Sequence, residues 1–245
     1  MTVGPRTDRP LGLAVRPSLM LVLASFVVAS WLTLDLILGG PMSRFDEFVA
    51  DRIGPWQVGD DYPLVYGICW TITQIGGQRV LILIVMAALV GYLCWTRRTL
   101  QPLARTLLAL LLLTITVYAF KYGLGRTAPE FPGGSFLHRD GQSYPSGHTA
   151  NAVLMWGLAT WLAVYYGLPV RVQRLFATLF VVSPIASAVT MLLLNFHWVT
   201  DLLTGAAVGL ILLWVVHVVF DGPLGRWTGI PDTRADRIPT SSVSA

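Results

Sequence analysis

The chain has 245 residues, of which 54% are hydrophobic and 12% are charged, and its formal net charge is +4. The charged share is about half that of soluble domains, so the charges are too few to cover a water-exposed surface of this size. The composition excludes an ordinary soluble enzyme and indicates an integral membrane protein. The basic residues spread through loops instead of forming a patch, so they do not indicate nucleic-acid binding.

Six apolar stretches are long enough to cross about 30 Å of hydrocarbon, and we expect each to be a transmembrane helix. Pro184 is expected to kink the fifth of them. The first is too long an apolar run for a cleavable signal peptide. The expected fold is therefore an all-α polytopic membrane protein. Its six spans lie near Ser18–Leu38, Arg79–Trp95, Leu103–Phe120, Thr149–Leu168, Leu175–Leu194 and Leu202–Phe220.

Residues 39–77 separate the first two spans and are expected to lie along the outer membrane interface. Ser43-x-x-Asp46 resembles a capping box, which predicts a helix that starts at Ser43. The stretch Pro63–Ile75 is apolar but too short to span comfortably, so we expect a second interfacial helix there.

The distribution of arginine sets the orientation. One side of the spans carries eleven basic and four acidic residues, and the other carries six basic and nine acidic residues. The side richer in basic residues faces the cytoplasm, so both termini are expected to be cytoplasmic. The expected organisation is a cytoplasmic segment 1–17, a membrane domain 18–221 and a cytoplasmic tail 222–245.

Two polar segments lie at the edges of apolar stretches. Pro145-Ser146-Gly147-His148 precedes the fourth span, and a Ser-Gly pair that opens a helix offers backbone N–H groups to a phosphate. His197 and Asp201 precede the sixth span and are four residues apart, so on a helical turn the carboxylate can orient the imidazole. Together they indicate phosphoryl-transfer chemistry.

A third segment is expected at the same membrane face. Lys121, the only lysine of the chain, and Arg126 follow the outer end of the third span. Segments far apart in the sequence thus bring polar groups to one face, which favours a shared site over scattered structural residues. Lys121 can also be read as an interfacial anchor, and Arg126 as a loop charge.

These segments resemble the three signature segments of the type 2 phosphatidic acid phosphatase (PAP2) superfamily. The resemblance implies that His197 is a nucleophile that forms a phosphohistidine, that Asp201 orients it, and that His148 protonates the leaving group. It also implies a phosphate grip made by Lys121, Ser146 and the Gly147 backbone. The resemblance implies no cofactor and no metal, and we see no carboxylate cluster suited to magnesium.

The chain departs from the usual family pattern at two phosphate-binding arginines. Ala128-Pro129 stands where the first segment usually has Arg-Pro, and Thr190-Met191 stands where the third usually has Ser-Arg. We expect Arg126 to take over part of the phosphate binding. Arg139, in the loop before the Pro-Ser-Gly-His segment, is a second candidate, although it also fits a solvated loop residue.

The expected function is a metal-independent lipid phosphatase in the plasma membrane, with its site on the extracytoplasmic face. The substrate is a lipid phosphate or diphosphate, with polyprenyl diphosphate, phosphatidate and phosphatidylglycerol phosphate as candidates. Two alternatives remain open. One is a lipid phosphotransferase that uses the same intermediate, and the other is a catalytically silent lipid-phosphate binder. The sequence does not indicate an oligomeric state.

Overall fold

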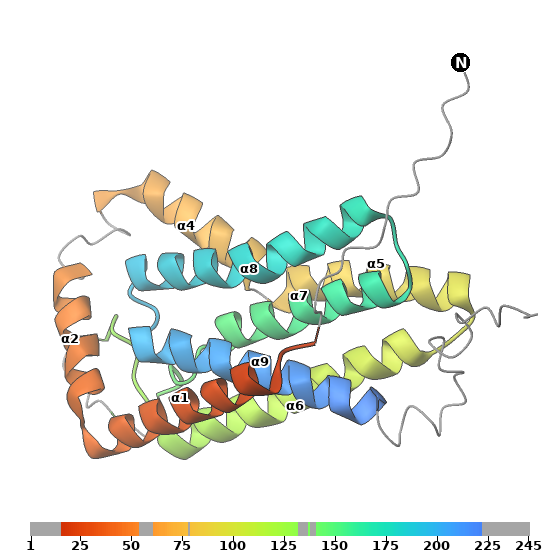
Figure 1. Cartoon of the computed structure of the whole chain (residues 1–245). Coiled ribbons are helices and arrows are strands. Elements are labelled where there is room, and N and C mark those ends of the chain that lie inside the picture. The colour runs from red at the N-terminus through yellow and green to blue at the C-terminus, as the bar shows by residue number, and fades with distance from the viewer. Residues whose placement is uncertain (1–15, 54–60, 78, 132–136, 138–140, 222–245) are drawn as a thin grey trace, which may run out of the picture.

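The computed structural model describes residues 16–53, 61–77, 79–131, 137 and 141–221, and these residues form a helical bundle. Its long helices run side by side, and α2 lies across one end of them (Figure 1). The expected all-α membrane fold is confirmed. The helices are α1 (Leu19–Leu38), α2 (Pro41–Ile53), α4 (Pro63–Gly76), α5 (Arg79–Arg97), α6 (Gln101–Leu124), α7 (Gly147–Tyr165), α8 (Val170–Leu193) and α9 (Val199–Asp221).

Each of the six expected spans coincides with one of these helices. Within the described residues, five helical stretches are long and apolar enough to cross a membrane. The expected span outside that set is α7, whose first turns carry the polar residues His148 and Asn151. Pro184 lies within α8, which continues through it. The five stretches are Leu19–Leu38, Pro63–Arg97 (α4 and α5 taken together), Gln101–Leu124, Val170–Leu193 and Val199–Phe220.

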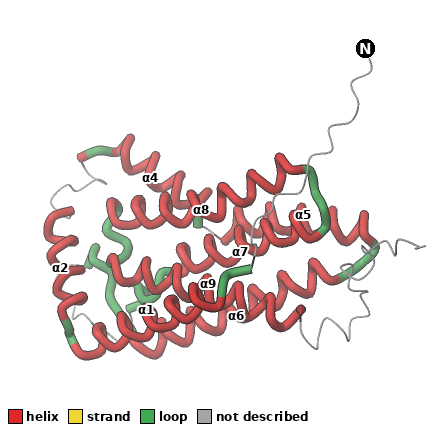
Figure 2. The backbone as a smooth tube through the Cα atoms, viewed as in Figure 1, coloured by secondary structure: helices red, strands yellow, loops and turns green. Residues whose placement is uncertain are grey.

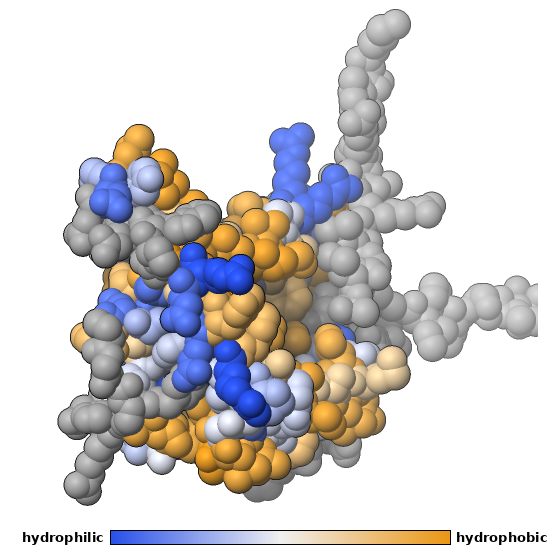
Figure 3. All heavy atoms as spheres, turned by 90° about the vertical axis from the view of Figure 1, so that its left-hand side faces the viewer, coloured by the Kyte–Doolittle hydropathy of each residue, from blue (hydrophilic) through white to orange (hydrophobic). Residues whose placement is uncertain are grey.

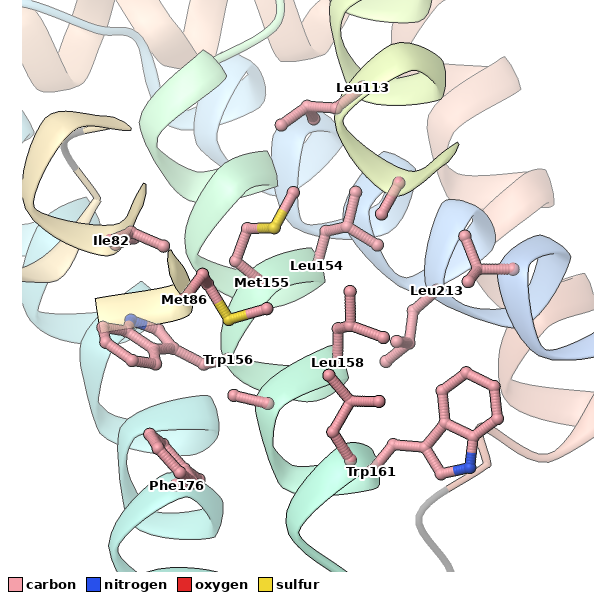
Figure 4. Close-up of a cluster of buried hydrophobic side chains, with 14 of the residues drawn as sticks. Ile82, Met86, Leu113, Leu154, Met155, Trp156, Leu158, Trp161, Phe176 and Leu213 are labelled. Atoms are coloured by element: carbon pink, nitrogen blue, oxygen red, sulfur yellow. The ribbon is translucent and has the colours of Figure 1, made fainter. Parts of the chain in front are cut away.

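Helix α7 is the centre of the bundle, and its side chains from Thr149 to Ala163 are all buried. Figure 4 shows its residues, such as Met155 and Leu158, among side chains from the neighbouring helices. The indole N–H of Trp156 donates to Ser183 Oγ on α8 at 3.0 Å. Because α7 is enclosed on all sides, the position of its first turn is fixed by packing.

Helix α9 approaches α7 closely through two glycines. A Cβ at Gly205 would lie 2.5 Å from the carbonyl oxygen of Ser146, and one at Gly209 would lie 2.8 Å from that of Ala150. Lipid tails are as apolar as leucine, so close backbone contact through small residues is a main source of helix association in membranes. These glycines bring the start of α9 against the start of α7.

The expected capping box at Ser43 is wrong. Helix α2 begins at Pro41, so Ser43 lies inside it. The start of α2 is capped instead by Asp35, whose carboxylate accepts from the N–H groups of Met42 at 3.3 Å and Ser43 at 2.9 Å. A carboxylate at the end of α1 therefore fixes the direction of α2, and Asp46 is left for another role.

The expected second helix of the segment 39–77 is α4, and it is distinct from α5. The two are separated at Gly77, whose N–H donates to Thr73 O at 3.0 Å. The expected cytoplasmic segments lie almost wholly outside the described residues, which exclude 1–15 and 222–245.

Candidate active site

Three connections meet at the end of the bundle where α2 lies. The loops α1–α2, α6–α7 and α8–α9 all lie at this end, whereas α5–α6 and α7–α8 join at the other end (Figure 2). Hydrophilic residues gather on this end, with hydrophobic residues around them (Figure 3). A cavity of about 530 Å³ opens here, within the usual range of small-ligand pockets, roughly 300–1,000 Å³. Its wall includes Arg79, Lys121, Ala128, Glu130, Gln142, Gly147, His148 and His197.

His197 and Asp201 are in contact. His197 Nδ1 lies 3.2 Å from Asp201 Oδ2, and the backbone N–H of Trp198 donates to the same oxygen at 3.1 Å. Ser143 Oγ also donates to Asp201 Oδ2 and lies 3.3 Å from His197 Nδ1. When Nδ1 carries its proton toward the carboxylate, the lone pair of the imidazole is on Nε2. His197 also lines the cavity.

The second oxygen of Asp201 pairs with Arg126. The guanidinium donates through Nη1 to Asp201 Oδ1 at 2.5 Å and through Nη2 to Asp46 Oδ2 at 2.7 Å. All three side chains are fully buried. Thr200 completes the group, since its N–H donates to Asp46 Oδ1 at 3.0 Å and its Oγ1 accepts from Arg126 at 2.7 Å. We call Asp46, Arg126, Ser143, Thr200 and Asp201 the buried network.

The backbone around Arg126 turns the side chain inward. Gly125 ends α6 in the left-handed region at φ 62°, which glycine adopts without strain. A Cβ at Gly141 would lie 2.3 Å from the carbonyl carbon of Arg126, so only glycine fits there. The N–H of Ser143 then donates to Arg126 O at 2.8 Å. The two chain segments that flank the cavity are thus held together beside Asp201.

This geometry differs from the expectation that Arg126 contacts phosphate. Its guanidinium faces Asp46 and Asp201, and Arg126 is not among the residues that line the cavity. No sequence pattern connects it with Asp46, which is 80 positions away and was interpreted only as part of a helix cap.

The start of α7 forms the floor of the cavity with Gly147 and His148. Ser146, expected to be part of the phosphate grip, is fully buried and acts as the N-cap of α7. Its Oγ accepts from the N–H of Thr149 at 3.4 Å, and its N–H donates to Asp201 O at 2.9 Å. This segment therefore presents to the cavity the N-terminus of α7, where the helix dipole is positive.

Lys121 and Glu130 carry opposite charges on the cavity wall. Lys121 Nζ donates to the carbonyl oxygen of Gln142, which holds the ammonium group beside the loop that precedes α7. Glu130 is exposed, but partial desolvation raises the pKa of its carboxyl group above the ordinary value, and the positive charge of a protonated His197 opposes that shift. Glu130 and His197 therefore lie close enough within one cavity for their charges to interact.

The two positions that lack the usual arginines have different surroundings. Ala128 lines the cavity, so an arginine there would reach it. Met191 is buried, with 2% of its surface exposed. The hydroxyl group of its neighbour Thr190 forms a hydrogen bond with that of Thr73, with 2.7 Å between the two oxygens. Arg139, the other proposed substitute, lies outside the described residues.

Several residues of this site were missed by sequence reasoning. Arg79 and Glu130 line the cavity, Ser143 contacts Asp201, and Thr200 and Asp46 contact the arginine that pairs with Asp201. Arg79 was interpreted only as the first residue of a span. The sequence contained one indication that Ser143 belongs to the site, which is its position three residues before the Ser-Gly-His segment. Among the described residues, no three His, Cys, Asp or Glu side chains gather as metal ligands would.

Comparisons with known proteins bear on the family and the fold. The model of the PAP2 superfamily matches residues 102–223. One solved structure that resembles this chain is that of the first transmembrane PAP2 type phosphatidylglycerolphosphate phosphatase, from Bacillus subtilis. It aligns with a TM-score of 0.61 and 20% sequence identity over 82% of this chain and 94% of that chain. At this identity the likeness shows a shared fold. No curated protein matches the sequence.

Proposed function

Because the chain belongs to the PAP2 superfamily, we propose that it is an integral membrane phosphatase that hydrolyses a lipid phosphate or diphosphate through a phosphohistidine. The observation that carries the proposal is the position of His197. Its Nδ1 contacts the buried carboxylate of Asp201, while its ring borders the cavity shared by His148 and Lys121.

In the first half-reaction, Nε2 of His197 attacks the phosphorus atom of the substrate. The bond between phosphorus and the leaving oxygen breaks, and His148 donates a proton to that oxygen. Asp201 stabilises the positive charge that develops on the imidazole. Lys121 and the N-terminus of α7 bind the equatorial oxygens of the transferred group, where negative charge is spread in the transition state.

In the second half-reaction, water attacks the phosphohistidine. His148, now neutral, accepts a proton from the water, the P–N bond breaks, and inorganic phosphate leaves with both histidines restored. An acceptor other than water would give the phosphotransferase alternative with the same intermediate. Labelled phosphate recovered on a lipid or sugar, instead of as free phosphate, distinguishes that outcome.

Arg126 receives a different role from the one expected for it. We propose that it is a positioning residue, since it contacts Asp201 from the side away from the cavity and links it to Asp46 on α2. Two carboxylates fully buried side by side need a shared cation. Arg126 therefore fixes the carboxylate that in turn fixes His197.

The candidate substrates are polyprenyl diphosphate, phosphatidate and phosphatidylglycerol phosphate. The related Bacillus subtilis protein is described as a phosphatidylglycerolphosphate phosphatase, which makes that lipid a necessary member of any test panel. The arginine distribution supports a cavity on the extracytoplasmic side of the plasma membrane.

The test is a phosphate-release assay of the purified chain on these three lipids in the presence of EDTA. We expect release by the wild type on at least one lipid, and none by His197→Ala. His217 lies buried on α9 and is not among the residues that line the cavity, so His217→Gln is the matched control and should retain activity. Equal release by the wild type and His197→Ala would refute the assignment of the nucleophile.

A further inference from the structure

The corner between α4 and α5 is held by side chains from the centre of the bundle. Asn151 Nδ2 donates to Gly77 O at 3.1 Å, and Trp156 Nε1 lies 3.4 Å from Gly76 O, which also accepts from Ser183. Both glycines are buried. The corner is therefore a fixed part of the bundle, and the start of α5 is held in place with it.

The same corner touches the candidate acid. A Cβ at Gly77 would lie 2.8 Å from His148 Cβ and 2.7 Å from Ser187 Oγ, so the backbone passes directly over the first turn of α7. Two residues later, Arg79 begins α5. Its side chain enters the cavity wall beside His148 and Lys121.

Arg79 is half-buried, and its guanidinium lies 5.7 Å from the ring centroid of Tyr118 on α6. The positive charge of Arg79 lies close enough to repel the charge of Lys121 and that of a protonated His148. Like charges that face one cavity repel each other in the absence of an anion. A bound phosphate between them converts that repulsion into attraction, so this wall is suited to an anion.

Ala128 lines the same cavity and stands where the family usually has an arginine. We propose that Arg79 is a phosphate-binding residue of the lipid phosphatase, which supplies from α5 the charge that is absent at position 128. The inference rests on the proposed function. In it, Arg79 binds the non-transferring oxygens of the substrate phosphate together with Lys121 and the N-terminus of α7.

The test is calorimetric binding of inorganic phosphate to the full-length purified chain. Removal of one charge-assisted contact should weaken binding about tenfold to a hundredfold in Arg79→Ala. Arg79→Lys keeps the charge but loses the planar fork, so its affinity should lie between those of the wild type and Arg79→Ala. Arg44→Ala is the matched control, because it removes an exposed arginine from α2, at the same end of the molecule, and should leave phosphate binding unchanged.

A rescue variant sharpens the test. Arg79→Ala combined with Ala128→Arg should recover phosphate affinity, because both positions line one cavity. The inference is overturned if Arg79→Ala binds phosphate within about twofold of the wild type while Lys121→Ala binds it more weakly. Thermal unfolding of each variant accompanies the titrations, and Arg79→Gln supplies the same comparison if Arg79→Ala does not fold.

Failure of this inference is distinguishable from failure of the proposed function. Lipid turnover with KM and phosphate affinity unchanged in Arg79→Ala keeps the phosphatase and removes the role of Arg79. Phosphate binding that depends on Arg79, in a chain that releases no phosphate from any tested lipid, supports Arg79 and contradicts the phosphatase.

Discussion

The two sides of His197 are built differently. On one side lies the buried network, in which both oxygens of Asp201 are engaged by donors from four different residues. On the other side lies the cavity, whose positive groups come from α5, α6 and α7 and are partly exposed. A carboxylate can orient the imidazole of His197 from only one position, whereas positively charged side chains can bind a phosphate from several directions. The network side is therefore sensitive to small changes, and the cavity side can exchange one arginine for another.

The strongest test of the network side is Asp201→Asn. An amide in place of the carboxylate keeps the size but removes the charge that orients and stabilises the imidazole of His197. In a serine-protease triad the corresponding change lowers kcat by roughly 10⁴, and we expect a loss of about a thousandfold or more here. Steady-state kcat on the preferred lipid measures it, with inorganic phosphate affinity as the control that should stay near the wild-type value. A loss of less than about tenfold would mean that Asp201 does not act through His197.

Arg126→Ala separates the two sides more sharply. It leaves Asp46 and Asp201, both fully buried, without their shared cation, which typically costs about 3–5 kcal/mol of stability. We expect a lower thermal midpoint and a lower kcat, with phosphate affinity unchanged because Arg126 lies outside the cavity wall. Arg126→Lys should recover part of both. If Arg126→Ala weakens phosphate binding as much as Arg79→Ala, Arg126 contacts phosphate after all.

Glu130→Gln is the mildest change, and it acts on the cavity side. A deprotonated Glu130 repels phosphate, and partial desolvation raises its pKa. The repulsion is therefore absent below that pKa and appears as pH rises through it, so the wild-type KM should increase over that interval. Glu130→Gln should lack this step and have a KM about two- to fivefold lower at neutral pH. A pH profile of KM for both proteins provides the measurement, and identical profiles would show that Glu130 does not face the bound phosphate.

Much of the fold was predictable, because the thickness of the bilayer sets the length of the apolar stretches that cross it. The placement of His148 and His197 at one end of the bundle was predictable for the same reason, since each lies at the edge of a span. The boundary of α2 was not. The pattern at Ser43 fits a helix cap, but the carboxylate of Asp35 accepts from the N–H groups of Met42 and Ser43, and the helix begins earlier, at Pro41.

The partners of Arg126 and the approach of Arg79 were beyond sequence reasoning. Both depend on close backbone contacts, at Gly141 for Arg126 and at Gly77 for Arg79, that only three-dimensional packing creates. A single arginine at the start of a span looks like any interfacial charge. The function of Arg79 depends on which helix Gly76 and Gly77, just before it, contact.

The central claim is that Nε2 of His197 becomes phosphorylated, and rapid quenching with ³²P-labelled lipid phosphate tests it most directly. The wild type should trap protein-bound label that is released by acid and stable in base, as a phosphohistidine is. His197→Ala should trap none. Arg79→Ala should need a higher substrate concentration than the wild type to trap the same amount of label. Label that persists in His197→Ala, or turnover by the wild type without any trapped label under conditions that slow the second half-reaction, would contradict the account.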